Sequence, residues 1–226
     1  WWGLFKRSTV AVVIKTEEKS GVLHGIADKL YERNYNIIYT HLFLEDNFGK
    51  IYMEITGVDD MSDLLRYISN IPNVVEVHAH KTLYETFGKR VIVVGDGEIM
   101  AKTLQGGIME AELHNAHGET ISVDGMIIGG GVEIQEAIHS LDKLPRINAL
   151  VLSGSMMGGL ITDEIIKLKE NNNDLKIVSI DMLGDLDSVV DLVVNDPVQA
   201  GAMAVKLISD IDSYDDVLLD NKFLKS

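Results

Sequence analysis

The chain has 226 residues, of which 46% are hydrophobic and 24% charged, and its formal net charge is −15. This composition is typical of a folded globular protein and argues against a disordered chain. An acidic surface repels phosphate backbones, so we expect no nucleic-acid partner. The apolar runs have five residues or fewer, far below the roughly 20 that a membrane helix needs, so we expect no membrane span.

Cysteine is absent from the sequence. This excludes disulfides, thiolate metal sites and cysteine nucleophiles, and it is compatible with a reducing compartment, so we expect a cytoplasmic protein. Because the chain begins at Trp1 rather than at a methionine, we expect its natural start to be missing or trimmed.

The first part of the chain predicts strands and helices in the order βαββαβ. Ser20 is a candidate N-cap for the first helix, which we expect to end at Asn34. We expect strands over 9–15, 37–44, 50–57 and 74–80, a second helix over 61–69 and a hairpin turn over 46–49. This order predicts a ferredoxin-like domain, in which two helices cover one face of a four-stranded antiparallel sheet.

The second part repeats a strand, a glycine-containing turn and a helix. We expect strands over 90–94, 120–128, 149–152, 175–180 and 191–194. We expect helices over 98–113, 160–170 and 197–210, and a further helix that follows the glycines at 129–131 and ends near 144. This alternation predicts a doubly wound, Rossmann-like parallel sheet with helices on both faces. Twenty-three of the 35 acidic residues follow residue 88. We therefore predict an N-terminal domain over 1–88 and an α/β domain with a C-terminal tail over 89–226.

The turn from Glu17 to Leu23, followed by the Asn36-Ile37 pair that opens the next strand, resembles an ACT domain, a regulatory module that senses amino acids. The resemblance covers residues 8–82. It implies a homodimer at least, with a ligand held between two modules by Ser20, Gly21, Val22, Leu23, Asn36 and Ile37. One departure is that Lys19-Ser20-Gly21 lacks the proline of the family's Asp-x-Pro-Gly pattern.

The residues themselves explain why such a turn can bind an acid group. Gly21 permits a tight turn at a helix N-terminus, where unpaired N–H groups and the helix dipole favour a carboxylate. The alternative is that Gly21 and Asn36 serve only turn and strand geometry.

A second ligand site is expected where the glycine-rich turns follow the strands of the α/β domain, because ligands bind at the carboxyl ends of strands in such sheets. The candidates are Gly95, Asp96, Gly97, Gly129, Gly130, Ser153, Gly154, Ser155, Gly158 and Gly159. The first turn fits the opening of a dinucleotide fingerprint, but its third position is Met100 instead of glycine. We therefore expect no cofactor.

Two histidine pairs have spacings that metal sites use, namely His114 with His117 on a helix and His78 with His80 on a strand. We interpret both pairs as solvated surface residues and expect no metal.

These observations favour a regulatory protein that senses a small amino acid or related metabolite, with the α/β domain transmitting the signal or binding a second ligand. The chain also resembles uncharacterised archaeal proteins that join an ACT domain to such a domain. The alternative is an allosterically regulated enzyme that acts on a phosphorylated or carboxylated small molecule at the glycine-rich strand ends. A dimerising scaffold without a ligand is a third possibility.

Overall fold

The computed structural model describes residues 9–128, 133–154, 161–180 and 185–211. The chain forms two compact units that divide between Thr86 and Phe87. The domain boundary predicted after residue 88 lies close to this division.

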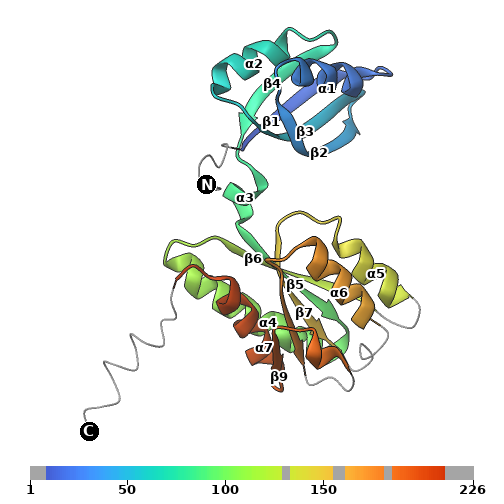
Figure 1. Cartoon of the computed structure of the whole chain (residues 1–226). Helices are drawn as coiled ribbons and strands as arrows, with labels where there is room; N and C mark the ends of the chain where they lie inside the picture. The colour runs from blue at the N-terminus through green and yellow to red at the C-terminus, as the bar shows by residue number, and fades with distance from the viewer. Residues whose placement is uncertain (1–8, 129–132, 155–160, 181–184, 212–226) are drawn as a thin grey trace, which may run out of the picture. The chain divides into compact units, whose positions relative to one another are not determined.

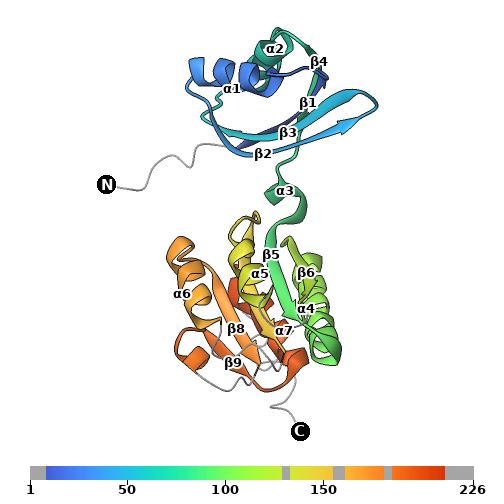
Figure 2. The same ribbon diagram turned by 90° about the vertical axis from the view of Figure 1, so that its right-hand side faces the viewer.

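The N-terminal unit is a four-stranded antiparallel sheet with the strand order β2-β3-β1-β4. Two helices cover one face of this sheet (Figure 2). The elements are β1 (Val10–Glu17), α1 (Val22–Glu32), β2 (Asn36–Glu45), β3 (Phe48–Thr56), α2 (Met61–Ser69) and β4 (Val74–His80). The βαββαβ order and the strand order confirm the ferredoxin-like, ACT-like arrangement.

The core of this unit forms because alternate strand residues meet the apolar stripes of the two helices. The buried residues include Val12, Ile14, Ile51, Met53 and Ile55 from the sheet and Val22, Ile26, Leu30, Leu64 and Ile68 from the helices. The hairpin between β2 and β3 turns at Asp46 and Asn47, both with positive φ, as a two-residue hairpin turn requires.

One short helix, α3 (Leu83–Phe87), was not predicted from the sequence. It begins with a capping box, in which the Glu85 carboxylate accepts hydrogen bonds from the backbone N–H and the hydroxyl of Thr82 at 2.7 and 2.9 Å. The helix lacks buried residues, so no apolar periodicity marks it in the sequence.

The C-terminal unit is a five-stranded parallel sheet with the order β6-β5-β7-β8-β9. Helices α4 and α7 pack against one face and α5 and α6 against the other (Figure 1). The elements are β5 (Lys89–Gly95), α4 (Gly97–Ala116), β6 (Ile121–Ile127), α5 (Glu133–Leu141), β7 (Ile147–Ser153), α6 (Thr162–Asn171), β8 (Lys176–Ile180), the 3-10 turn η1 (Asp185–Ser188), β9 (Leu192–Val194) and α7 (Pro197–Ile208). The doubly wound fold predicted from the sequence is confirmed.

This strand order places the topological switch point between β5 and β7, because the connection from β5 leads to β6 on one side and the connection from β7 leads to β8 on the other. The two strands end at Gly95 and Ser153, which are paired in register. Two of the three glycine-rich turns expected to bind a ligand, those after Gly95 and Ser153, therefore begin at the switch point.

Helix α4 is longer than the sequence predicted, since it continues to Ala116 instead of ending at 113. The end of the helix is held by Asn115, whose side chain donates to the backbone oxygen of Ile121 at 2.9 Å and accepts from its N–H at 2.7 Å. A side chain that disfavours helix interiors thus connects α4 to β6.

Among the described residues, no helix is long and apolar enough to cross a bilayer.

Candidate ligand-binding sites

The turn between β1 and α1 leaves the first N–H groups of α1 without a side-chain cap. Gly21 is the N-cap, with φ +83° and ψ 0°, and the first turn of the helix contains no acidic residue. The prediction that Ser20 caps this helix is therefore wrong. Because φ is positive at Gly21, the chain enters the helix one residue later than the hydroxyl of Ser20 requires.

A cavity of about 380 Å³ lies against this turn. Its lining includes Ser20, Gly21, Val22 and Leu23, which are four of the residues implied by the ACT resemblance. The remaining lining residues are Thr16, Glu17, Glu18, Lys19, Leu42, Leu44, Gly49 and Ile51. The cavity thus combines backbone N–H groups, charged side chains and an apolar wall from the β2–β3 hairpin.

Contacts within the same unit fix the shape of this cavity. The hydroxyl of Thr16 lies 3.4 Å from the backbone oxygen of Gly49, to which it donates, and a Cβ at Gly49 would lie 2.5 Å from that hydroxyl oxygen. Lys19 pairs with Glu17 at 2.5 Å and donates to the side-chain oxygen of Asn73 at 3.1 Å. These bonds tie the turn to β3 and to the loop before β4.

Asn36 and Ile37 do not line this cavity. They open β2 and pair with Thr56 and Ile55, whereas the cavity end of β2 pairs through Leu44 with Gly49. At about 3.3 Å per strand residue, Asn36 and Leu44 are about 26 Å apart along β2. A single copy therefore does not bring the two parts of the predicted site together.

Strand β2 is an edge of the sheet and exposes apolar side chains. Leu42 and Leu44, which form the wall of the cavity, are 45% and 60% exposed, and Ile38 and Phe43 are 49% and 43% exposed. A long apolar edge strand with unpaired backbone groups is a surface on which another strand can pair.

Tyr52 and Glu54 lie on the sheet face opposite the helices, a pair that the sequence did not indicate. Glu54 is 9% exposed and accepts hydrogen bonds from the Tyr52 hydroxyl and the Leu83 N–H, both at 2.6 Å. Burial, reinforced by the Glu54 carboxylate, raises the pKa of Tyr52 well above its usual value. These hydrogen bonds attach the segment after β4 to the sheet, so we interpret Tyr52 and Glu54 as structural residues.

In the C-terminal unit, five of the ten predicted site residues lie at the switch point. A Cβ at Gly95 would lie 1.5 Å from the Ser153 backbone oxygen, and one at Gly154 would lie 3.5 Å from the Asp96 carboxylate. Asp96 is the N-cap of α4 but its side chain makes no capping bond, and Gly97 begins the helix with φ +58°. The Ser153 hydroxyl donates to the Val94 backbone oxygen at 3.0 Å, so it holds the sheet together.

The other candidates at this edge, Gly129, Gly130, Ser155, Gly158 and Gly159, lie outside the described residues. Two hydroxyls that flank the same edge were not predicted as ligand-binding groups. Within the described ranges, Thr162 at the start of α6 and Ser179 near the end of β8 have buried hydroxyl oxygens without a hydrogen-bond partner. Unsatisfied buried hydroxyls are uncommon, and each calls for an explanation.

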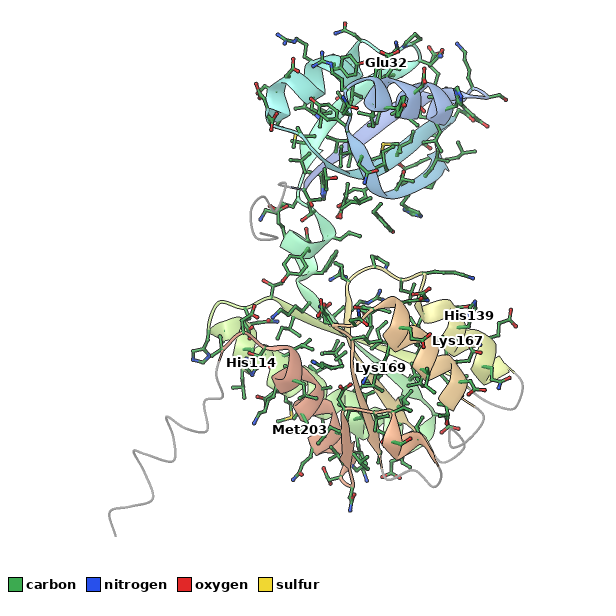
Figure 3. The ribbon with its side chains drawn as sticks, viewed as in Figure 1. Glu32, His114, His139, Lys167, Lys169 and Met203 are labelled. Carbon is green, nitrogen blue, oxygen red and sulfur yellow. The ribbon has the colours of Figure 1, made fainter. Side chains whose placement is uncertain are left out.

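His114 is buried, which corrects its interpretation as a solvated residue. Figure 3 labels this side chain, which lies in the last turn of α4. Its Nδ1 lies 2.8 Å from the Glu119 carboxylate and 2.9 Å from the Ser209 hydroxyl, and its Nε2 lies 3.2 Å from the Glu110 carboxylate. The cluster joins the end of α4 to the segment after α7.

By contrast, His78 and His80 are exposed on β4, as predicted. Within the described ranges, no group of three or more histidine or acidic side chains has metal-binding geometry.

The comparisons with known proteins identify relatives along most of the chain. The family described as the domain of unknown function DUF5612 matches residues 80–223. The uncharacterized protein MJ1458 of Methanocaldococcus jannaschii is 40% identical over 208 residues, which cover 91% of this chain and 95% of that protein. An uncharacterized protein of Archaeoglobus fulgidus is 37% identical over 207 residues, covering 89% of this chain and 93% of that one. The ACT domain from GTP pyrophosphokinase of Chlorobium tepidum is 18% identical with a TM-score of 0.31, covering 35% of this chain and 92% of that one.

Proposed function

The chain belongs to the DUF5612 family, and we propose that it is a cytoplasmic regulatory sensor whose N-terminal unit binds a small amino acid or related metabolite between two copies. The observation that carries this proposal is the cavity at the uncapped N-terminus of α1. Free N–H groups at a helix N-terminus, together with the helix dipole, favour a carboxylate. Glu18 on the same cavity supplies a partner for an ammonium group.

A second copy completes this site. Asn36 and Ile37 lie about 25 Å along β2 from Leu44 in the cavity wall, so they reach a ligand at the α1 turn only from a neighbouring chain. The apolar edge strand β2 supports such a neighbour, because pairing of this edge would cover its exposed side chains. Two-fold symmetry would then create two equivalent ligand sites per dimer.

Equilibrium dialysis against the common amino acids, in parallel with sedimentation equilibrium, tests the proposal. We expect saturable binding of a subset of amino acids at millimolar concentration or below and a dimeric protein. Gly21→Val should abolish binding, because a β-branched residue is strained at positive φ and displaces the helix N-terminus. Gly21→Asn is the matched control, since asparagine tolerates this conformation and a Cβ here meets nothing within 4 Å.

One observation favours a second candidate function at the switch point of the C-terminal unit. The buried hydroxyls of Thr162 and Ser179 lack partners among the described residues and flank the edge at which α/β sheets bind ligands. An enzyme that acts on a phosphorylated or carboxylated small molecule could use both hydroxyls as donors. To test this function, phosphate is titrated with the wild type and with Ser179→Ala, and binding is followed by the broadening of the ³¹P NMR line. If the function is correct, the wild type binds phosphate and the variant binds it more weakly.

A further inference from the structure

A second described cavity lies in the C-terminal unit, at the amino ends of β7 and β8, away from the glycine-rich turns. Its volume is about 290 Å³, near the lower limit for small-molecule sites. The floor is aliphatic and consists of Leu141, Leu150, Leu168 and Leu175, each at most 5% exposed. The part of the chain that the structure describes places no aromatic residue in the lining, so the apolar part of the cavity fits a branched aliphatic group.

A fixed cation borders the cavity on the side of β5. The guanidinium of Arg146 donates from Nη1 to the Gly88 backbone oxygen at 2.7 Å and stacks over the Phe87 ring at 5.3 Å. Arg146 also has φ +64°, a strained conformation for a residue with a side chain. Asn148 adds an amide on the same side, with its oxygen held by the Arg90 N–H at 3.2 Å.

Two carboxylates border the opposite side, from the loops that precede β7 and β8. Asp142 accepts a hydrogen bond from the Asn171 side chain at 3.2 Å, which connects its loop to the end of α6. Asp174 is exposed, and its N–H donates to the Asn172 side chain at 3.3 Å in a turn that presents the carboxylate. Because β8 and β5 flank β7 on opposite sides, Asp174, in the loop before β8, and Arg146, which bonds to Gly88 before β5, lie toward opposite sides of the cavity.

We propose that this cavity binds a small aliphatic α-amino acid, such as leucine or valine, as a zwitterion. Arg146 and Asn148 receive the carboxylate, Asp174 and Asp142 receive the ammonium group, and the side chain rests on the four leucines. The site lies wholly within the unit that begins at Phe87. It is therefore independent of the ligand proposed for the N-terminal unit.

Methyl NMR of the full-length chain tests the inference, because each leucine reports on its own cavity. The probes are L-leucine, 4-methylpentanoate, which lacks the ammonium group, and 3-methylbutylamine, which lacks the carboxylate. We expect L-leucine to shift the methyl signals of Leu141, Leu168 and Leu175 saturably, and each truncated probe to bind about tenfold more weakly.

Three variants separate this site from the N-terminal one. Asp174→Lys should weaken the leucine-induced shifts at Leu141 and Leu168 about tenfold, because it places a cation beside the ammonium group. Glu170→Lys makes the same charge change at an exposed residue that does not line the cavity and should leave binding within about twofold. Gly21→Val should leave these shifts unchanged.

Leucine shifts confined to Leu42 and Leu44 would overturn the inference while supporting the proposed function. Equal binding of leucine and the truncated probes, or equal binding by Asp174→Lys and the wild type, would also overturn it, because the charges would then play no part. Shifts at Leu141, Leu168 and Leu175 that persist in Gly21→Val and weaken in Asp174→Lys would support this inference even if the N-terminal site binds nothing.

Discussion

At the scale of single residues, His114 illustrates how a polar cluster can act as structure. The imidazole lies between the carboxylates of Glu110 and Glu119 and is 2% exposed. Ser209 donates to Glu119 at 2.7 Å and the N–H of Asp210 donates to the same carboxylate at 2.6 Å. Removal of one member leaves the remaining carboxylates buried without a partner. This costs more free energy of unfolding than the loss of an exposed ion pair.

We therefore predict that His114→Ala destabilises the C-terminal unit by about 3 kcal/mol, because it leaves two carboxylates together without their shared partner. Urea unfolding followed by circular dichroism measures the free energy of unfolding. His117→Gln is the control, since His117 is an exposed residue on the same helix end. A change below about 0.5 kcal/mol for His114→Ala would show that the cluster is not structural.

The same cluster predicts a pH dependence of stability. Burial raises the pKa of Glu119, but hydrogen bonds from Ser209, the Asp210 N–H and His114 outweigh it and leave the pKa below its usual value. Because the pKa of Glu119 is lower in the folded than in the unfolded state, its ionised form stabilises the native state at pH values above the pKa of the unfolded state. This stabilisation is lost as the pH falls through the pKa of the folded state. Urea unfolding at a series of pH values should show a loss of stability below about pH 4.5 that is smaller in Glu119→Gln than in the wild type. Parallel profiles for the two proteins would contradict this.

At the scale of elements, the contact between α4 and α7 depends on glycines that let the helices approach closely. A Cβ at Gly106 would lie 1.9 Å from the Val198 backbone oxygen, and a Cβ at Gly201 would lie 1.9 Å from the Thr103 backbone oxygen. Figure 1 shows the two helices side by side. Backbone atoms on the opposite helix cannot give way as a flexible side chain would, so the helices must move apart if either glycine gains a side chain.

Gly106→Ala should therefore destabilise the C-terminal unit by about 2 kcal/mol, although alanine is the better helix former. Gly25→Ala, at a helix position where a Cβ meets nothing within 4 Å, should instead stabilise its unit by about 0.5–1 kcal/mol. Thermal unfolding of both variants gives the comparison. Equal and small effects would mean that the α4–α7 spacing adjusts freely.

Sequence reasoning predicted the elements well where periodicity is strong. The bounds of α2 and β4 match their predicted ranges, and both units have the predicted strand and helix order. The sequence did not predict α3, because this helix buries no apolar residue. The predicted α4 was too short, because the end of this helix is held by the side chain of Asn115, which hydrogen-bonds to β6. Periodicity carries no signal for bonds between residues that meet only after folding.

At the candidate site, the sequence indicated the α1 turn but not the wall that completes its cavity. Leu42 and Leu44 belong to a hairpin more than twenty residues along the chain and meet the turn only in the folded sheet. The burial of His114 was likewise missed, because Ser209 lies far along the chain from it. Residues close in sequence could be assigned to a site, whereas contacts between distant elements could not.

For the whole molecule, the proposed ligand site requires that β2 of one copy lie near the α1 turn of another. Leu42→Ser combined with Leu44→Asp should convert the dimer to a monomer and abolish amino-acid binding, because it places polar groups on the apolar edge. Sedimentation equilibrium measures the mass, and dialysis measures the ligand. Thr40→Ser, at another exposed residue of β2, should preserve both properties. A monomeric variant that still binds would place the complete site within one chain.

Subunit complementation tests whether the ligand site is shared between two copies of the chain. Gly21→Val disables the α1 turn, and Asn36→Glu repels the ligand carboxylate from the start of β2, so neither variant alone should bind an amino acid that the wild type binds. In a mixed dimer, the intact turn of one chain meets the intact β2 of the other, so unfolding and refolding equal amounts together should restore about one quarter of the sites. Failure of the mixture to bind, while the wild type binds, would contradict a site shared between two copies.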